Sequence, residues 1–127
     1  MPASTVTAIG RLKTRADFLH VREGARFAAP SLVLQARARG DADHAGAGLA
    51  RFGFTATKTL GGAVVRNRAR RRLKEAVRLV APTYAMEGYD YVLIARAGTV
   101  QRRFTELTKD LERALTKVHQ APRPQKR

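Results

Sequence analysis

The residues with the clearest chemical potential are the cations between Lys58 and Arg78. This stretch of 21 positions holds eight basic residues and one acidic residue, Glu75, so its local charge is +7. Six of the eight cations are arginines, and a guanidinium can hold a phosphate through two hydrogen bonds or stack on an unpaired base. A solvated helical face normally mixes both signs of charge. The near absence of acids therefore favours a surface that binds a polyanion.

The same stretch predicts a helix that begins after Gly61 and Gly62, runs to about Val80 and ends at Pro82. Its apolar residues fall within an arc of about 100°, which leaves one face for a core. These residues are Ala69, Leu73, Ala76, Val77 and Val80. Cations in the first turns lie near the positive end of the helix dipole, and each costs the helix about 0.3–1 kcal/mol of stability. Acidic residues are usually preferred in these turns. Because the cations bring no evident structural gain there, they indicate a functional surface.

The histidines do not form a recognisable catalytic group. His20 falls on a predicted helix, His44 in a loop and His119 beside the C-terminal tail. No Ser or Cys constellation can be tied to them. Asp41 and Asp43 precede His44 in the same loop, but the segment lacks the glutamate and the spacing of a calcium site. We therefore expect no protein metal site.

Three carboxylates of the last predicted helix offer no better catalytic site. Glu106, Asp110 and Glu112 are expected on its outer, solvated side. The sequence thus predicts no catalytic residues and no self-contained nuclease activity.

Composition limits the class of protein. The chain has 127 residues, 44% of them hydrophobic, which suits one domain with one modest core. Its net charge of +15 requires a polyanionic partner, and nucleic acid is the first candidate. The longest apolar run, Tyr91 to Ala95, is too short to cross a membrane, and Met1 to Ile9 does not read as a secretory signal. The absence of cysteine fits a cytoplasmic protein.

The first half of the chain predicts a helix and two strands. The helix begins at Thr14, an N-cap supported by Asp17, and ends at Gly24. Alternation from Ser31 to Arg39 and from Arg51 to Thr57 predicts two strands. The segment between them, Gly40 to Gly48, is rich in glycine, so we expect the strands to pair antiparallel across it.

The second half predicts a buried strand and an amphipathic helix. Tyr89 to Arg96 is apolar on both faces at its centre, which indicates burial within the sheet. The last helix runs from about Arg102 to Val118. Its inward stripe comprises Phe104, Leu107, Leu111, Leu115 and Val118. In the first strand, Val33, Gln35 and Arg37 share an unusually polar face. This face is either the floor of a cleft or an ordinary solvated sheet surface.

Residues Gly61 to Glu75, GGAVVRNRARRRLKE, resemble the Arg-Asn-Arg motif of the bacterial ribonuclease P protein family. The resemblance continues through Arg11-Leu12-Lys13, Asp17-Phe18, Arg51 to Lys58 and Tyr91 to Ala97. It covers roughly residues 9 to 119. The resemblance therefore extends over nearly the whole chain.

The resemblance implies an α+β fold. In it, a small mixed sheet and three helices form a two-layer sandwich with a left-handed β-α-β crossover, although the general rule favours a right-handed one. It implies a single RNA-binding domain over residues 1–127, ordered from about 9 to 119, with flexible tails at 1–8 and 120–127.

The resemblance also implies two RNA-binding surfaces. The basic helix contacts a catalytic RNA subunit, and a cleft beside the first helix holds the single-stranded 5′ leader of precursor tRNA. The implied RNA-binding residues are Arg66, Asn67, Arg68, Arg70, Arg71 and Lys74. The implied cleft residues are Phe18, Arg22, Gln35, Arg37, Thr55 and Lys58. Arg22 and Gln35 stand where the family often has aromatic residues, so stacking on the leader is weaker in principle.

By the same resemblance the chain is the protein component of an endoribonuclease that forms the mature tRNA 5′ end. The RNA subunit performs the chemistry with bound Mg²⁺, and no protein partner or membrane is required. Two alternatives stay open on the residues alone. A ribosomal-type structural RNA-binding protein would have the same charge but no cleft. A DNA regulator would need mixed polar residues on its recognition helix, where this chain has mostly arginine.

Overall fold

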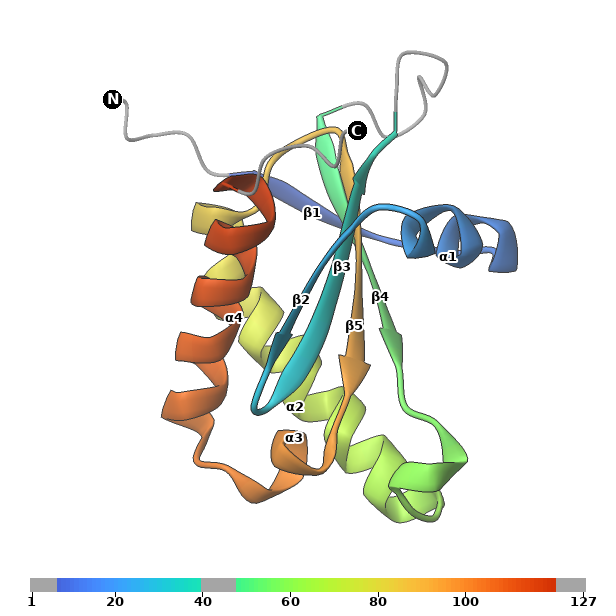
Figure 1. The fold of residues 1–127 in the computed structure, drawn as a ribbon, viewed down its shortest axis with the longest axis vertical. Helices are drawn as coiled ribbons and strands as arrows, with labels where there is room; N and C mark the ends of the chain where they lie inside the picture. Colours follow the sequence, from blue (N-terminus) through green and yellow to red (C-terminus); the bar gives the residue numbers. More distant parts are fainter. Residues whose placement is uncertain (1–6, 40–47, 121–127) are drawn as a thin grey trace.

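A computed structural model describes residues 7–39 and 48–120 of the chain (Figure 1). Strands and helices follow one another through the described part. In chain order they are β1 (Ala8–Arg11), α1 (Arg15–Arg22), β2 (Ala25–Ala29), β3 (Leu32–Ala38), β4 (Leu49–Thr55), the 3₁₀ turn η1 (Lys58–Leu60), α2 (Ala63–Tyr84), β5 (Tyr89–Ala95), α3 (Ala97–Gln101) and α4 (Phe104–Gln120). The expected loop at 40–48 and both expected tails lie largely outside the described residues.

The strands form one mixed sheet in the order β1-β4-β5-β3-β2. β4 is parallel to β1 and β5, whereas β3 is antiparallel to β5 and β2. The α+β class is therefore confirmed, but the expected direct pairing of β3 with β4 is wrong. β5 lies between these two strands. Its apolar centre is best buried with a neighbour on each side, and this long-range pairing displaces the local hairpin.

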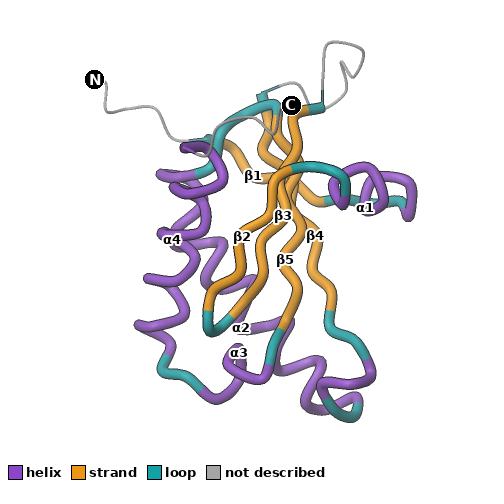
Figure 2. Tube along the Cα trace, in the orientation of Figure 1, coloured by secondary structure: helices purple, strands orange, loops and turns teal. Residues whose placement is uncertain are grey.

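Two helices cover one face of the sheet and a short helix covers part of the other. Figure 2 shows α2 and α4 on one side and α1 on the opposite side. The core between the sheet and the two long helices contains the expected stripe of α2, all of whose residues are at most 5% exposed. β4, α2 and β5 form a crossover between parallel neighbours. Its left-handed sense stays a prediction of the resemblance.

The sequence patterns did not predict β1, β2 or α3. β1 has four residues and β2 has five, and both lie at an edge of the sheet. α3 has five residues. Elements this short do not show a recognisable repeat of apolar and polar residues, and they are held by neighbours that are distant in sequence.

The expected end of the basic helix at Pro82 is wrong, because α2 continues to Tyr84 with Pro82 inside its last turn. Proline cannot donate to the carbonyl four residues earlier, so one backbone hydrogen bond is lost. Val80 and Ala81 are buried, as is Ala85 just after the helix. Their burial against the core keeps the last turn helical.

The expected solvent position of Asp110 on α4 is also wrong. Asp110 is 7% exposed, and its Oδ2 accepts hydrogen bonds from the backbone nitrogen of Ser31 at 3.2 Å and from its hydroxyl at 2.5 Å. The turn between β2 and β3 thus docks on α4 through a satisfied buried carboxylate. The hydroxyl of Thr99 donates to the carbonyl of Ser31 at 2.6 Å and fixes α3 at the same point.

A second buried carboxylate, Asp90 on β5, joins three parts of the chain. Its side chain is 2% exposed. Arg39 Nη1 donates to Oδ1 at 2.8 Å, and Arg51 donates to both carboxylate oxygens at 2.8 Å. Arg51 Nη2 also lies 3.7 Å from Oδ1 of Asp17 on α1. This Asp90 cluster connects β5 with β4, with the first helix and with Arg39 at the end of β3.

Replacement of Asp90 by asparagine should lower the free energy of unfolding by about 3–5 kcal/mol, because it removes the buried negative charge that Arg39 and Arg51 share. Urea unfolding measures this loss. The matched control is Glu75→Gln, which removes the acid of the exposed pair with Arg78 and should leave stability nearly unchanged. Equal effects of the two substitutions would show that the Asp90 cluster does not hold the fold.

Candidate RNA interface

The sheet face opposite α2 and α4 carries three rows of side chains that run across the strands. Residues that are partners in the register lie side by side on one face. The upper row, beneath α1, comprises Arg51, Asp90 and Arg37. The middle row comprises Gly53, Val92, Gln35 and Arg26. The lower row comprises Thr55, Ile94, Val33 and Ala28.

Phe18 of α1 lies directly on the middle row at Gly53. A Cβ atom added at Gly53 would lie 2.4 Å from Cζ of Phe18, so only glycine permits this approach. Phe18 also packs against a small cluster of Leu12, Val21 and Val92, and it remains half-buried. The aromatic ring is thus anchored at one side while it borders open space at the other.

The start of α1 is fixed by the expected capping box. The hydroxyl of Thr14 accepts from the backbone nitrogen of Asp17 at 3.1 Å, and the Asp17 carboxylate accepts from the backbone nitrogen of Thr14 at 3.3 Å. Partial burial raises the pKa of Asp17, but hydrogen bonds from Thr14 and Lys13 and the charge of Arg51 outweigh it. The pKa therefore lies below its ordinary value, and Asp17 stays ionised next to Arg51.

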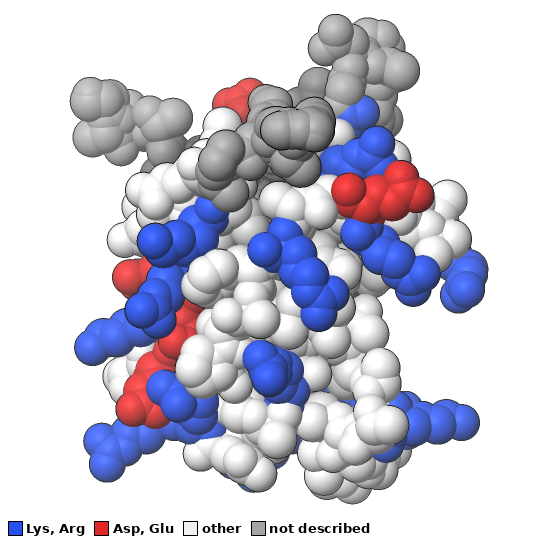
Figure 3. Space-filling view, in the orientation of Figure 1, with Lys and Arg blue, Asp and Glu red and all other residues white. Residues whose placement is uncertain are grey.

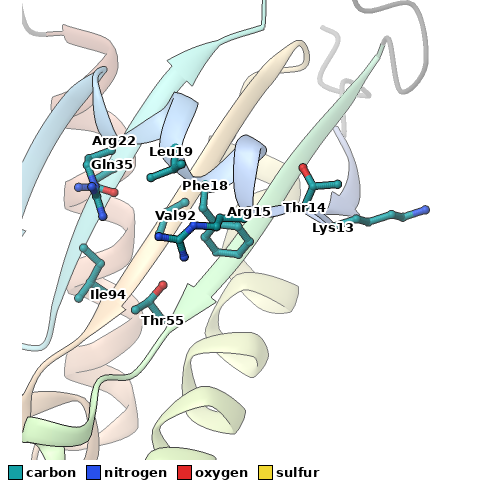
Figure 4. Close-up of a pocket in the computed structure, with 10 residues that line it drawn as sticks. All are labelled: Lys13, Thr14, Arg15, Phe18, Leu19, Arg22, Gln35, Thr55, Val92 and Ile94. Carbon is teal, nitrogen blue, oxygen red and sulfur yellow. The ribbon is translucent and has the colours of Figure 1, made fainter.

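The space between α1 and the middle and lower rows is a cleft of about 400 Å³, which we call the α1 cleft. Its lining is a mixture of one aromatic residue, cations, polar groups and apolar strand residues. They are Lys13, Thr14, Arg15, Phe18, Leu19, Arg22, Gln35, Thr55, Val92 and Ile94. Figure 4 shows Lys13 and Thr14 at one end, Arg22 and Gln35 at the other, and Phe18 between them. Such a cleft suits a flat base with a flanking anionic backbone.

Four of the six predicted cleft residues line the α1 cleft: Phe18, Arg22, Gln35 and Thr55. Arg37 lies outside it, because its guanidinium donates to the carbonyl of His20 at 3.0 Å and lies 3.4 Å from Glu23. Lys58 lies in η1, beyond the end of β4.

Six further cleft residues were not predicted from the sequence, namely Lys13, Thr14, Arg15, Leu19, Val92 and Ile94. Helical spacing could have identified Arg15, which precedes Phe18 by three positions and so shares its side of α1. Strand alternation could have identified Val92 and Ile94 as residues of one face. Nothing local indicated that this face meets α1.

The cations of α2 differ in how far they are engaged within the protein. Arg68, Arg71 and Lys74 are exposed, and Arg66 and Arg70 are half-buried. Asn67 is exposed and its Oδ1 accepts from Arg70 at 3.0 Å. The predicted RNA-binding residues therefore all lie on one helix and all reach solvent at least in part, but they are spread around it rather than along one side.

Two other arginines of α2 have structural partners. Arg72 Nε donates to the carbonyl of Thr99 at 2.7 Å, and its Nη2 donates to the carbonyl of Arg102 at 2.5 Å. Its guanidinium thereby ties α2 to α3. Arg78 pairs with Glu75 at 2.5 Å, which lowers the pKa of that carboxylate through the hydrogen bond from Arg78. Neither arginine is as available to a polyanion as its neighbours.

The candidate catalytic groups lie apart from both surfaces or in structural contacts. The ring of His119 lies 2.6 Å from the Tyr91 hydroxyl, and burial lowers the pKa of His119 and raises that of Tyr91. Asp41, Asp43 and His44 lie outside the described residues. Within the described residues, no three His, Asp or Glu side chains are grouped to hold a metal ion. Nor does this part of the chain contain a helix that could cross a membrane.

Comparison of the sequence with known proteins agrees with the candidate RNA-binding surfaces described above. The family model for Ribonuclease P matches residues 8–119. The ribonuclease P protein component of Gluconacetobacter diazotrophicus is 53% identical over 109 residues, which are 85% of this chain and 90% of the relative. That of Ruegeria pomeroyi is 47% identical over 127 residues and spans 97% of this chain and 98% of the relative.

Solved structures share the fold. The RNase P protein from Thermotoga maritima superposes with a TM-score of 0.66 at 26% identity, over 88% of this chain and 97% of that one. The RNase P protein from Staphylococcus aureus gives a TM-score of 0.66 at 26% identity, over 84% of this chain and 92% of that one. With a family match over most of its length, close relatives and the shared mixed sheet, the chain belongs to the ribonuclease P protein family.

Proposed function

We propose that this chain, as the ribonuclease P protein subunit, binds two different RNA segments. The predicted RNA-binding residues of α2, which lie between Arg66 and Lys74, bind the catalytic RNA. The α1 cleft binds the 5′ leader of precursor tRNA. Binding both segments at once promotes endonucleolytic removal of the leader, which forms the mature tRNA 5′ end.

The observation that carries this proposal is the separation of the two surfaces. α2 covers one face of the sheet, whereas the α1 cleft opens on the other face (Figures 1 and 4). The first surface consists of exposed cations that suit the phosphates of a folded RNA. The second combines an aromatic ring with cations, as single-stranded nucleic acid requires. One extended RNA-binding patch would not need this division.

In this proposal the hydrolysis takes place on the RNA subunit, in the cytoplasm. Mg²⁺ bound there activates the attacking water. The residues of this chain contribute by holding the leader and by placing cations among closely spaced phosphates. Lower repulsion between the phosphates favours binding of both Mg²⁺ and substrate.

Replacement of Arg68 and Arg71 by alanine should weaken binding of the catalytic RNA while the melting temperature stays nearly constant, because both side chains are exposed. If the helix neutralises about five phosphates, the slope of log affinity against log salt in the parent protein should be about −3 to −5. The double variant should show a slope shallower by about 1–2. Filter binding over a salt series measures both quantities.

The matched control is Arg72→Ala on the same helix. Since Arg72 donates to two backbone carbonyls, its loss should reduce stability by about 1–3 kcal/mol. It should change the salt slope less than the double variant does. If the double variant lost stability and affinity together, Arg68 and Arg71 would have to be structural residues.

The α1 cleft is tested by replacement of Phe18 with leucine, which keeps apolar volume on Gly53 but removes the aromatic face. Stacking of a base contributes about 1–3 kcal/mol. The reconstituted complex should therefore bind precursor tRNA with a 5′ leader about five-fold more weakly, or worse. Mature tRNA has no leader to stack, so its dissociation constant should hardly change.

A thermal melt of Phe18→Leu and its affinity for the catalytic RNA serve as controls, and both should match the parent protein. Equal weakening of leader-bearing and leaderless tRNA would contradict the leader cleft. That result would favour a structural RNA-binding protein with no role in selecting precursor tRNA.

A further inference from the structure

Arg26 on β2 is an exposed cation with no assigned role. Within the described residues it makes no hydrogen bond or ion pair. Its neighbour Phe27 packs on the main core, so alternation along the strand directs Arg26 to the opposite face, the one that carries the α1 cleft. The guanidinium is therefore available to a ligand on that face.

The register places Arg26 at the open end of the middle row. Its partner on β3 is Gln35, and the partner of Gln35 on β5 is Val92. Both partners line the α1 cleft. The row thus leads from Phe18 on Gly53, across two strands of cleft floor, to Arg26. Neighbouring strands lie about 4.8 Å apart, so Gly53 and Arg26 are about 14 Å apart along the row.

The charges around this end of the row favour an anionic ligand. Arg22, at the last turn of α1, lines the cleft beside Gln35. The nearest acid in sequence, Glu23, faces Arg37 at 3.4 Å. Figure 3 shows single cationic side chains on a mostly uncharged surface over the sheet, while acidic side chains lie mainly along α4 and beside α1. Among the residues that the structure describes, none forms an ion pair that neutralises Arg26.

From this geometry we propose that Arg26 extends the α1 cleft across β2 and binds a backbone phosphate of the single-stranded RNA leader. The proposal rests on the proposed function and deepens it. A base stacked on Phe18 leaves the rest of the strand free to follow the middle row. A phosphate that passes Gln35 then meets the guanidinium of Arg26, with Arg22 on the helix side. Arg26 would thus supply through charge some of the contact that an aromatic residue at position 35 would make by stacking.

The test uses the reconstituted complex and precursor tRNAs whose 5′ leaders increase by one nucleotide. Arg26→Ala should leave the dissociation constant of leaderless and shortest-leader tRNA unchanged. It should weaken binding about three- to ten-fold once the leader is long enough to reach β2. The salt slope for long leaders should become shallower by about 0.7, the value for one phosphate of a single strand. Arg26→Lys should retain most of the affinity.

Arg113→Ala is the matched control, since Arg113 is an exposed arginine of α4 on the other side of the sheet. It should have no leader-dependent effect. If Arg26→Ala behaves like Arg113→Ala at every leader length, the proposal is overturned, and Arg26 is only a cation that keeps the edge strand from pairing. The same holds if it weakens leaderless and leader-bearing tRNA equally.

The Phe18→Leu variant separates the two levels of inference. The preference for leader-bearing over leaderless tRNA could be lost with Phe18→Leu but kept with Arg26→Ala. This result would refute the proposed role of Arg26 and leave the proposed function standing. If both variants bind leader-bearing tRNA as tightly as the parent protein, both the leader cleft and its extension fail. A melt of each variant shows that folded protein is compared in every case.

Discussion

The structure depends on the need to cover β5 on both faces. Tyr91 and Leu93 point into the core beneath α2 and α4, and Val92 and Ile94 point to the opposite face. Hydrophobic burial favours a cover for each pair. The two long helices cover the first pair completely, with Tyr91 and Leu93 fully buried. α1 is too short to do the same, so it buries Val92 and leaves Ile94 partly open. The α1 cleft is the uncovered remainder of this face.

The position of α1 links folding to the proposed binding of RNA. Among the contacts that hold the helix are the approach of Phe18 to Gly53 and the ion pairs that connect Asp17 through Arg51 to Asp90. The first determines how close the ring lies to the sheet, and the second holds the first turn of the helix. Because both act on consecutive residues of one helix, a disturbance of the buried Asp90 cluster would also move the aromatic wall of the cleft. Residues without any contact to RNA can therefore affect substrate binding.

The large positive charge is divided between structural and available cations. Arg39 and Arg51 surround a buried carboxylate, Arg72 ties two helices together, and Arg78 is paired with Glu75. Others, such as Arg68, Arg71 and Arg26, are exposed. Net charge thus indicates the class of partner but not the surface that meets it. The neighbours of each guanidinium decide whether it can bind a phosphate.

Local patterns in the sequence determined those helices and strands that are long enough to show a full repeat of apolar residues, and the faces that they bury. The stripe of α2, the capping box at Thr14 and the two-sided apolar centre of β5 all follow from neighbours within a few positions, and all are present in the structure. The resemblance at Gly61 to Glu75 added the family. Residue types and spacing alone thus indicated the basic surface of α2, whereas the resemblance indicated the Arg-Asn-Arg motif and Phe18, whose roles in binding are proposals.

Only the tertiary structure decided which elements meet. The insertion of β5 between β3 and β4, the edge strands β1 and β2, and the burial of Asp110 against Ser31 depend on contacts between residues far apart in the chain. The same holds for the cleft, since the register across four strands aligns Gly53, Val92, Gln35 and Arg26. Periodicity specifies the face on which a side chain lies. The partner of that face is set by the competition among all apolar surfaces for burial, which no local segment contains.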